Sequence, residues 1–259
     1  MNLVYGIVLF CLAAALSWPL GRYMTWALRS ARIDRIDRIL ARWLGLKVFE
    51  PQSWNTYARS LLVLNGLMFV LVFLILVCQG WLPLNPDAKV GLEPSLAFHT
   101  AMSFTTNTNL QHYSGEQSLS YFSQIFGLTW LQFVSAATGI AALAAIARAL
   151  GPTKEVGNFY RDAARTTLLI LLPLSFLLGL LLVFLGIPMT LDGAAIAHTI
   201  EGATQTIARG PVAAMVAIKQ LGTNGGGFFG PNSTHPFENS SFVTAAIENV
   251  AILLIPMAS

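Results

Sequence analysis

The chain alternates long apolar stretches with polar loops. Four of these stretches carry no charged side chain, namely residues 3–21, 61–79, 120–147 and 167–187. Each has the ~20 residues that an α-helix needs to cross a hydrocarbon layer ~30 Å thick. A fifth apolar stretch begins near Ser241 and runs to Ser259. The pattern predicts an all-α polytopic membrane protein.

The charged residues between these stretches predict the direction of each helix. Most of the Lys and Arg lie in two segments, residues 22–59 and 148–165. The positive-inside rule places both segments in the cytoplasm and the N-terminus outside the cell. The expected spans then alternate in direction over residues 3–21, 60–80, 119–148, 166–187 and 241–259.

The basic segment 22–59 could in principle contact nucleic acid or lipid. Its Arg residues are spaced as on a helix and are mixed with Asp34, Asp37 and apolar side chains. This mixture favours an amphipathic helix that lies against the inner leaflet of the membrane. We therefore expect membrane lipid, and no nucleic acid, among the partners of this chain.

Two external segments contain a repeated motif. Residues 94–104 begin with proline and precede Thr-Thr-Asn-Thr-Asn, whereas residues 211–221 begin with proline and precede Gly-Thr-Asn-Gly-Gly-Gly. Pro94 matches Pro211 and Thr106 matches Thr223 at the same offset, without a gap. Each copy lies between two apolar stretches. We expect a unit of outer helix, short re-entrant helix, filter loop and inner helix, which occurs twice after one extra helix.

Such a loop suits the binding of a dehydrated monovalent cation through backbone carbonyls, and we expect this cation to be potassium. Carbonyls on successive residues can face one point only if the backbone adopts unusual angles. Glycine reaches these angles at little cost and asparagine tolerates them. Threonine can add hydroxyl oxygens. The predicted filter residues are Thr106, Asn107, Thr108, Asn109, Thr223, Asn224, Gly225, Gly226 and Gly227.

Other motifs in the chain carry little chemistry. Residues 225–230 spell G-x-G-x-x-G, but they follow a predicted helix and precede a Pro-Asn loop, which is the wrong context for a dinucleotide site. Cys11 and Cys78 lie in predicted spans and indicate neither a disulfide nor a metal site. The chain has no phosphate-binding G-x-x-x-x-G-K-[ST] sequence, so we expect no ATP site and no catalytic residue here.

The two filter motifs and their surroundings carry a family resemblance. The first is Ser-Phe-Thr-Thr-Asn-Thr-Asn at 103–109, followed by Tyr-Ser-Gly-Glu and Leu-Ser-Tyr-Phe-Ser-Gln. The second is Leu-Gly-Thr-Asn-Gly-Gly-Gly-Phe-Phe at 221–229, followed by Asn-Ser and His-Pro-Phe-Glu-Asn. Together with Leu-Pro-Leu-Asn-Pro at 82–86, they resemble the potassium-binding A subunit of the bacterial Kdp potassium-transporting ATPase.

This resemblance implies a function and a set of partners. The A subunit selects extracellular potassium and passes it to a P-type ATPase subunit, which hydrolyses ATP, within a complex that also holds small accessory membrane subunits. It implies a multi-pass protein of the bacterial inner membrane. The resemblance further implies four pore units in about ten helices. We therefore expect this sequence to be the first part of a longer protein, with its second unit truncated.

Three expectations stay open at this stage. The chain is divided here into 1–58 (first helix and basic loop), 59–150 (first pore unit) and 151–259 (second pore unit). Glu248 lies in the fifth apolar stretch and either lines the ion pathway or meets water near the outer end. Lys219 is a candidate pathway residue, but a structural or tuning role is favoured because its long side chain can turn toward water.

An alternative function is a passive or ion-coupled potassium transporter built from the same pore repeats. The two alternatives differ in the partner that they need. A pump requires an ATPase chain, whereas a transporter needs at most a regulatory soluble protein.

Overall fold

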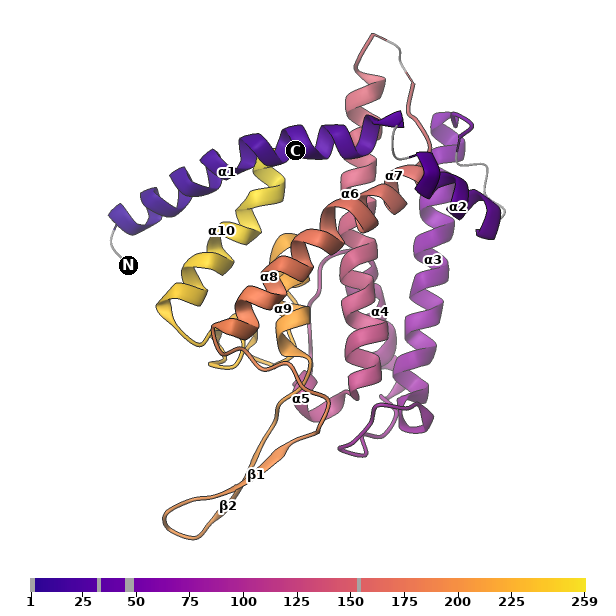
Figure 1. Cartoon of the computed structure of the whole chain (residues 1–259). Coiled ribbons are helices and arrows are strands. Elements are labelled where there is room, and N and C mark those ends of the chain that lie inside the picture. Colours follow the sequence, from indigo (N-terminus) through magenta and orange to yellow (C-terminus); the bar gives the residue numbers. More distant parts are fainter. Residues whose placement is uncertain (1–2, 32–33, 45–48, 153–154) are drawn as a thin grey trace.

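The computed structural model describes residues 3–31, 34–44, 49–152 and 155–259, and these residues are mostly helical (Figure 1). Four helical segments are long and apolar enough to cross a membrane: Leu3–Arg29, Trp54–Trp81, Ser123–Ala149 and Phe159–Phe184. They correspond to the first four predicted spans. The prediction of an all-α polytopic membrane protein is thus confirmed.

These segments are built from the labelled elements as follows. The first is α1 (Leu3–Arg29), and the second is α3 (Trp54–Cys78) with a 3-10 turn at Gln79–Trp81. A π-helical turn at Ser123–Thr129 leads into α6 (Trp130–Ala149). The fourth comprises α7 (Phe159–Arg165), a π-helical turn at Thr166–Leu171 and α8 (Leu172–Phe184). The fifth apolar stretch forms the shorter helix α10 (Phe242–Ala258).

The helix ends differ from the predicted spans where polar residues continue or cap the helix. Helix α1 extends eight residues beyond the expected end at Gly21, to Arg29, because charged side chains can lie in the last turn. Helix α3 starts earlier than expected, since the Ser53 hydroxyl accepts a hydrogen bond of 3.3 Å from the Thr56 N–H. The Asn158 side chain caps α7 in the same way, by accepting from the Tyr160 N–H at 3.1 Å.

Both predicted short helices are present. They are α4 (Pro94–Thr105) and α9 (Val212–Leu221). Helix α4 packs against α3 and α6, and α9 packs against α8 and α10 (Figure 1). Each copy thus has a short helix between two longer ones, as the repeat predicted. One detail was wrong: Pro211 caps α9 from outside, with ψ of 49°, whereas Pro94 is the first helical residue of α4.

A hairpin of two strands was not predicted. Strand β1 (Ala195–His198) pairs antiparallel with β2 (Thr204–Ile207), and Ala195 lies opposite Ile207. Figure 1 shows the hairpin extending away from the helices. A four-residue helix, α5 (Gly115–Ser118), also interrupts the loop before the third span. Elements this short leave too few periodic positions to be recognised from one sequence.

The two basic segments meet at one end of the molecule. Helix α2 (Asp34–Leu44) supplies Asp34 and Asp37, and both accept hydrogen bonds from Arg165 at the end of α7. The fully buried Arg165 also donates to the carbonyl of Ser30 at 3.1 Å. These contacts place the segments around 22–59 and 148–165 on the same side of the helices, which is consistent with the predicted topology.

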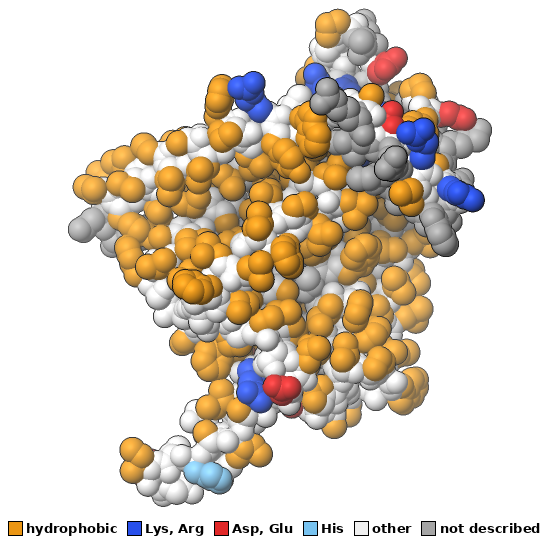
Figure 2. Space-filling model, viewed as in Figure 1, with side chains coloured by type: hydrophobic (Ala, Val, Ile, Leu, Met, Phe, Trp, Pro, Cys, Tyr) orange, Lys and Arg blue, Asp and Glu red, His pale blue; other side chains and the backbone are white. Residues whose placement is uncertain are grey.

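The surface has the pattern expected of a membrane protein. Figure 2 shows apolar side chains over the flanks of the helices and charged side chains near the α2 end and at the base of the hairpin. Inside, one apolar cluster includes Phe104 of α4, Val216 of α9 and Phe228 from the loop after α9. The two repeated units therefore share one core, which fixes the positions of the two Thr-Asn loops.

Candidate functional site

The loops after α4 and α9 begin with the same hydrogen-bond pattern. In the first, the Thr108 N–H donates to the Ser103 carbonyl at 2.9 Å and Asn107 lies between them with φ of +61°. In the second, the Asn224 N–H donates to the Lys219 carbonyl at 3.0 Å and Thr223 has φ of +53°. This is a Schellman ending, in which a left-handed residue reverses the chain just after the helix.

The left-handed residues are only partly the expected ones. Asn107, Asn109 and Gly225 have positive φ, as predicted, with Asn109 at +54° and Gly225 at +109°. Asn224 does not, because the Schellman ending falls one residue earlier in the second copy. Thr223 takes the left-handed position instead. A β-branched residue is strained there, and such strain is found where a loop is held by its surroundings.

Gly226 and Gly227 are small because other atoms approach them closely. The sequence had suggested instead that they provide unusual backbone angles, and this reason was wrong. Neither has positive φ. A Cβ on Gly226 would lie 2.6 Å from Cζ of Phe104 and 2.9 Å from the carbonyl oxygen of Asn109. A Cβ on Gly227 would overlap the carboxylate of Glu238. The second loop is therefore packed tightly against the first loop and against the segment that precedes α10.

The two loops are bonded directly to each other through Asn107. Its Nδ2 donates to the carbonyl oxygen of Gly222 at 3.3 Å, and its Oδ1 accepts from Nδ2 of Asn224. The same oxygen accepts from the Ser135 hydroxyl of α6 at 2.8 Å. The matched positions 107 and 224 thus meet in space, although they are far apart in the sequence.

Two glutamines hold the glycines of the second loop. Nε2 of Gln132, on α6, donates to the Gly226 carbonyl at 2.7 Å. Gln111 bonds Gly227 twice, by accepting from its N–H at 3.0 Å and donating to its carbonyl at 3.0 Å. The Gly226 and Gly227 carbonyls each keep one lone pair for a further partner. Sequence reasoning missed both glutamines; a polar Gln132 within an apolar stretch was the available signal.

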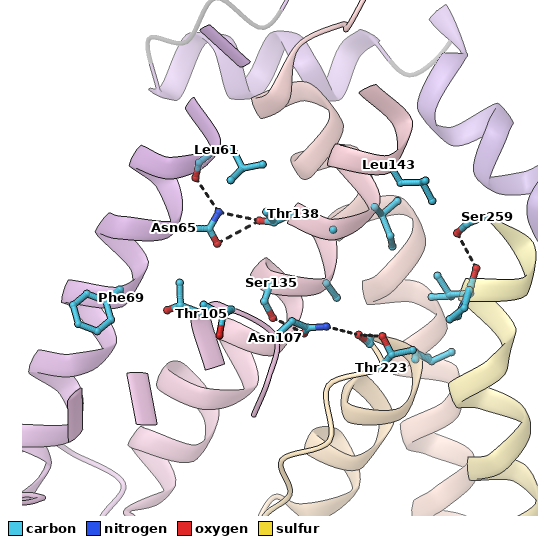
Figure 3. A pocket seen from close by; sticks show the side chains of 18 of the residues that line it. Leu61, Asn65, Phe69, Thr105, Asn107, Ser135, Thr138, Leu143, Thr223 and Ser259 are labelled. Atoms are coloured by element: carbon cyan, nitrogen blue, oxygen red, sulfur yellow. Dashed lines mark hydrogen bonds between the residues drawn. The ribbon is translucent and has the colours of Figure 1, made fainter. Parts of the chain in front are cut away.

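A cavity of about 780 Å³ lies between the two loop starts and the helices α3, α6 and α10 (Figure 3). Thr106 and Asn107 line it from the first loop, and Gly222 and Thr223 line it from the second. The Thr106 hydroxyl donates to the Met102 carbonyl at 3.0 Å, and the Thr223 hydroxyl donates to the Gly222 carbonyl at 2.7 Å. Their protons are thereby engaged, and lone pairs on both hydroxyl oxygens remain available.

Lys219 and Glu248 do not lie at this cavity. Lys219 is 1% exposed, so the expectation that its side chain turns toward water was wrong. Glu248 is 3% exposed, which argues against one of its two open interpretations, the one in which it meets water. Lys219 pairs with Glu238, and Glu248 accepts a hydrogen bond of 2.6 Å from Nε2 of Gln220. Both side chains lie in a buried polar cluster against the second loop. Neither is among the residues that line the large cavity.

Within the described ranges, His, Cys, Asp and Glu form no group of three that could hold a metal ion. The oxygens at the loops are instead hydroxyls, amide oxygens and backbone carbonyls. Such neutral oxygens can coordinate a monovalent cation while allowing it to leave again.

The sequence model of one protein family matches nearly the whole chain. The family is described as the potassium-transporting ATPase A subunit, and the match covers residues 7–259. The chain therefore belongs to this family. Family membership makes it a membrane subunit of a potassium-transporting ATPase, within a complex with other Kdp subunits.

Proposed function

We propose that this member of the potassium-transporting ATPase A subunit family selects potassium at the loops after α4 and α9. The observation that carries the proposal is the meeting of the two matched loops: Asn107 bonds Gly222 at 3.3 Å, and both line a cavity that Thr106 and Thr223 also line. A filter needs several loops to present oxygens toward one region, and this contact brings two of them together.

The proposed ligands are the oxygens of the nine predicted filter residues, from Thr106 to Asn109 and from Thr223 to Gly227. Backbone carbonyls supply most of them, and the threonine hydroxyls add oxygens at the edge of the cavity. The carbonyls of Gly226 and Gly227 contribute through the lone pair that Gln132 and Gln111 leave unused. Potassium is the cargo of this site, and it is the ion that the family description names.

The short helices favour a cation at the same place. The last residue of α4, Thr105, and the last residue of α9, Leu221, both line the cavity. The C-terminal end of a helix carries about half a negative charge. Two such ends at one cavity lower the energy of a positive ion there without adding a fixed carboxylate that would hold it.

The energy for transport comes from another chain in this proposal. The P-type ATPase subunit hydrolyses ATP, and small accessory membrane subunits complete the complex. The chain lies in the bacterial inner membrane with its N-terminus outside, so that the loops after α4 and α9 receive extracellular potassium. The Asp34–Arg165 contact supports this topology, because it keeps both basic segments at one end. The family match favours the pump over the passive transporter.

The test is ATP hydrolysis by the tagged complex, purified from its native source, with and without micromolar potassium. We expect hydrolysis to rise with potassium and a P-type ATPase chain to co-purify. Potassium flux in vesicles without any associated ATPase would contradict the pump and leave the filter assignment standing.

A further inference from the structure

A buried cluster of charged side chains lies against the second loop. Its members are Lys219 on α9, Glu238 in the segment before α10, and Glu248 on α10. Their exposed fractions are 1%, 0% and 3%. Removing such groups from water costs several kcal/mol each, so they are rarely buried unless they pair with an opposite charge or serve a function.

The contacts place Glu238 against the backbone of the second loop and Lys219 against Glu238. Lys219 Nζ donates to the Ser233 hydroxyl at 2.6 Å and forms an ion pair with Oε2 of Glu238. The other carboxylate oxygen, Oε1, accepts from the Phe229 N–H at 2.8 Å. Glu238 also lies so close to Gly227 that a Cβ there would overlap its carboxylate. The carboxylate of Glu238 therefore lies beside residues 227–229, and Nζ of Lys219 is bonded to that carboxylate.

Glu248 joins the same cluster through the uncharged side chain of Gln220. Nε2 of Gln220 donates to Oε2 of Glu248 at 2.6 Å and to the Ser233 hydroxyl at 3.1 Å. Ser233 thus links the Lys219–Glu238 pair to the second carboxylate. Lys219 bonds Glu238 directly, whereas Glu248 joins the cluster through Gln220, so the partner that balances Lys219 most directly is Glu238.

We propose that Lys219 and Glu238 form a fixed charge pair that sets how tightly the second loop binds monovalent cations, but not which one it prefers. The inference rests on the proposed filter function of residues 223–227. An unbalanced Lys219 would repel a cation in the loop, and an unbalanced Glu238 would attract it, since buried charges are poorly screened. Potassium and rubidium carry the same charge, so both affinities shift together, while the choice between them depends on oxygen geometry.

The test compares three variants in the complete complex at pH 8: Lys219→Met, Glu238→Gln and the double variant. The readouts are the KM values for potassium and for rubidium in cation-stimulated ATP hydrolysis. We expect Glu238→Gln to raise both KM values, and Lys219→Met to lower both, on the order of tenfold, which corresponds to about 1.4 kcal/mol. The double variant should return close to the wild-type values. The ratio of the two KM values should stay the same throughout.

A purely structural role gives a different pattern. If the pair only supports the loop, both single variants raise KM and change the potassium-to-rubidium ratio, and this result would overturn the inference. An unchanged KM in Lys219→Met would also overturn it. Glu238→Gln leaves a buried ammonium unpaired and can prevent assembly. The fall of both KM values in Lys219→Met, and their return close to the wild-type values in the double variant, then decide the question.

Two controls separate this inference from the proposed function. Arg38→Met removes one positive charge from the exposed face of α2 and should leave both KM values unchanged. Gly226→Ser changes the loop itself. If Gly226→Ser alters KM while the charge variants do not, only the charge-pair inference fails. If Gly226→Ser also leaves affinity and selectivity unchanged, the filter assignment fails with it.

Discussion

The side-chain amide of Asn107 donates a hydrogen bond of 3.3 Å to the carbonyl oxygen of Gly222, which joins the loop after α4 to the loop after α9. Asn107 can do so because it takes the left-handed position of a Schellman ending, with φ of +61°. The same residue that reverses the chain after one helix therefore positions the end of the other. This bond makes the geometry of each loop depend on the other.

Asn107→Gly should weaken potassium binding without straining the backbone. Glycine accepts a positive φ, but the variant loses the bonds to Gly222, Asn224 and Ser135. We expect the KM for potassium in the purified complex to rise on the order of tenfold, as two or three hydrogen bonds of ~1 kcal/mol each are lost. Asn249→Ala is the control, because Asn249 is exposed on α10 and its amide bonds only the Ala245 carbonyl. An unchanged KM would contradict the coupling of the two loops.

Gly226→Ser should impair both affinity and selectivity. The added Cβ would lie 2.6 Å from Cζ of Phe104 and 2.9 Å from the Asn109 carbonyl oxygen, so the two loops must move apart. We expect weaker potassium binding and poorer rejection of rubidium or ammonium, measured as the ratio of KM values. Gly6→Ser on α1 is the matched control, since no heavy atom lies within 4 Å of the added Cβ there. Equal behaviour of the two variants would count against a filter at these loops.

Arg165→Met should destabilise the protein strongly. The guanidinium of Arg165 is fully buried and pairs with Asp37, which is also fully buried. In this variant Asp37 keeps, among the described residues, only Arg161, whose side chain is 28% exposed, so we expect a cost toward the lower end of the about 3–5 kcal/mol that breaking a buried ion pair typically carries. Thermal unfolding in detergent should show a clear fall in Tm. Arg38→Met, at an exposed position of the same basic region, should leave Tm nearly unchanged, and a similar fall in both variants would contradict this role for Arg165.

The stability that the N-cap residue of α4, Glu93, gives to the fold should depend on pH in the acid range. Hydrogen bonds from the Ser95 hydroxyl and from the backbone hold the pKa of Glu93 below its ordinary value of 4.5. Because the pKa is lower in the folded protein, this carboxylate stabilises the fold above pH ~4.5, and the contribution disappears as the pH falls below it. Glu93→Gln should therefore lower Tm at pH 7, whereas the difference from the wild type should shrink at acid pH, as the pH falls through the lowered pKa of Glu93 in the folded protein. A constant difference across this pH range would contradict a contribution from the charge.

The helices of this fold were predictable from the sequence, whereas the hairpin was not. Helices that face lipid must satisfy all backbone hydrogen bonds internally and must be about 20 residues long, so apolar runs reveal them directly. The two short helices were found because Pro94 and Pro211 start the same motif. The hairpin at 195–207 was missed, since its four-residue strands carry no strong alternation of apolar and polar residues.

The sequence predicted which residues form the candidate site, and their role stays a prediction, whereas the contacts among them come from the structure alone. Thr106, Asn107 and Thr223 were identified from the repeat, and the cavity does lie beside them. The supporting roles of Gln111 and Gln132 were missed, because they depend on which backbone groups the glutamines reach across the fold. Lys219 was expected to turn toward water, but it pairs with Glu238 inside the protein. This partner lies nineteen residues further along the chain, so local sequence does not reveal it.

The sequence by itself determined the membrane class, the repeated unit and the residue types of the two loops, because these follow from local periodicity and from matched spacing. Only the tertiary structure decided that Thr223 rather than Asn224 takes the left-handed position. It also decided that Gly226 and Gly227 are small because other atoms approach them. Close contacts between segments far apart in the chain arise from packing in three dimensions, and no pattern along one dimension records them.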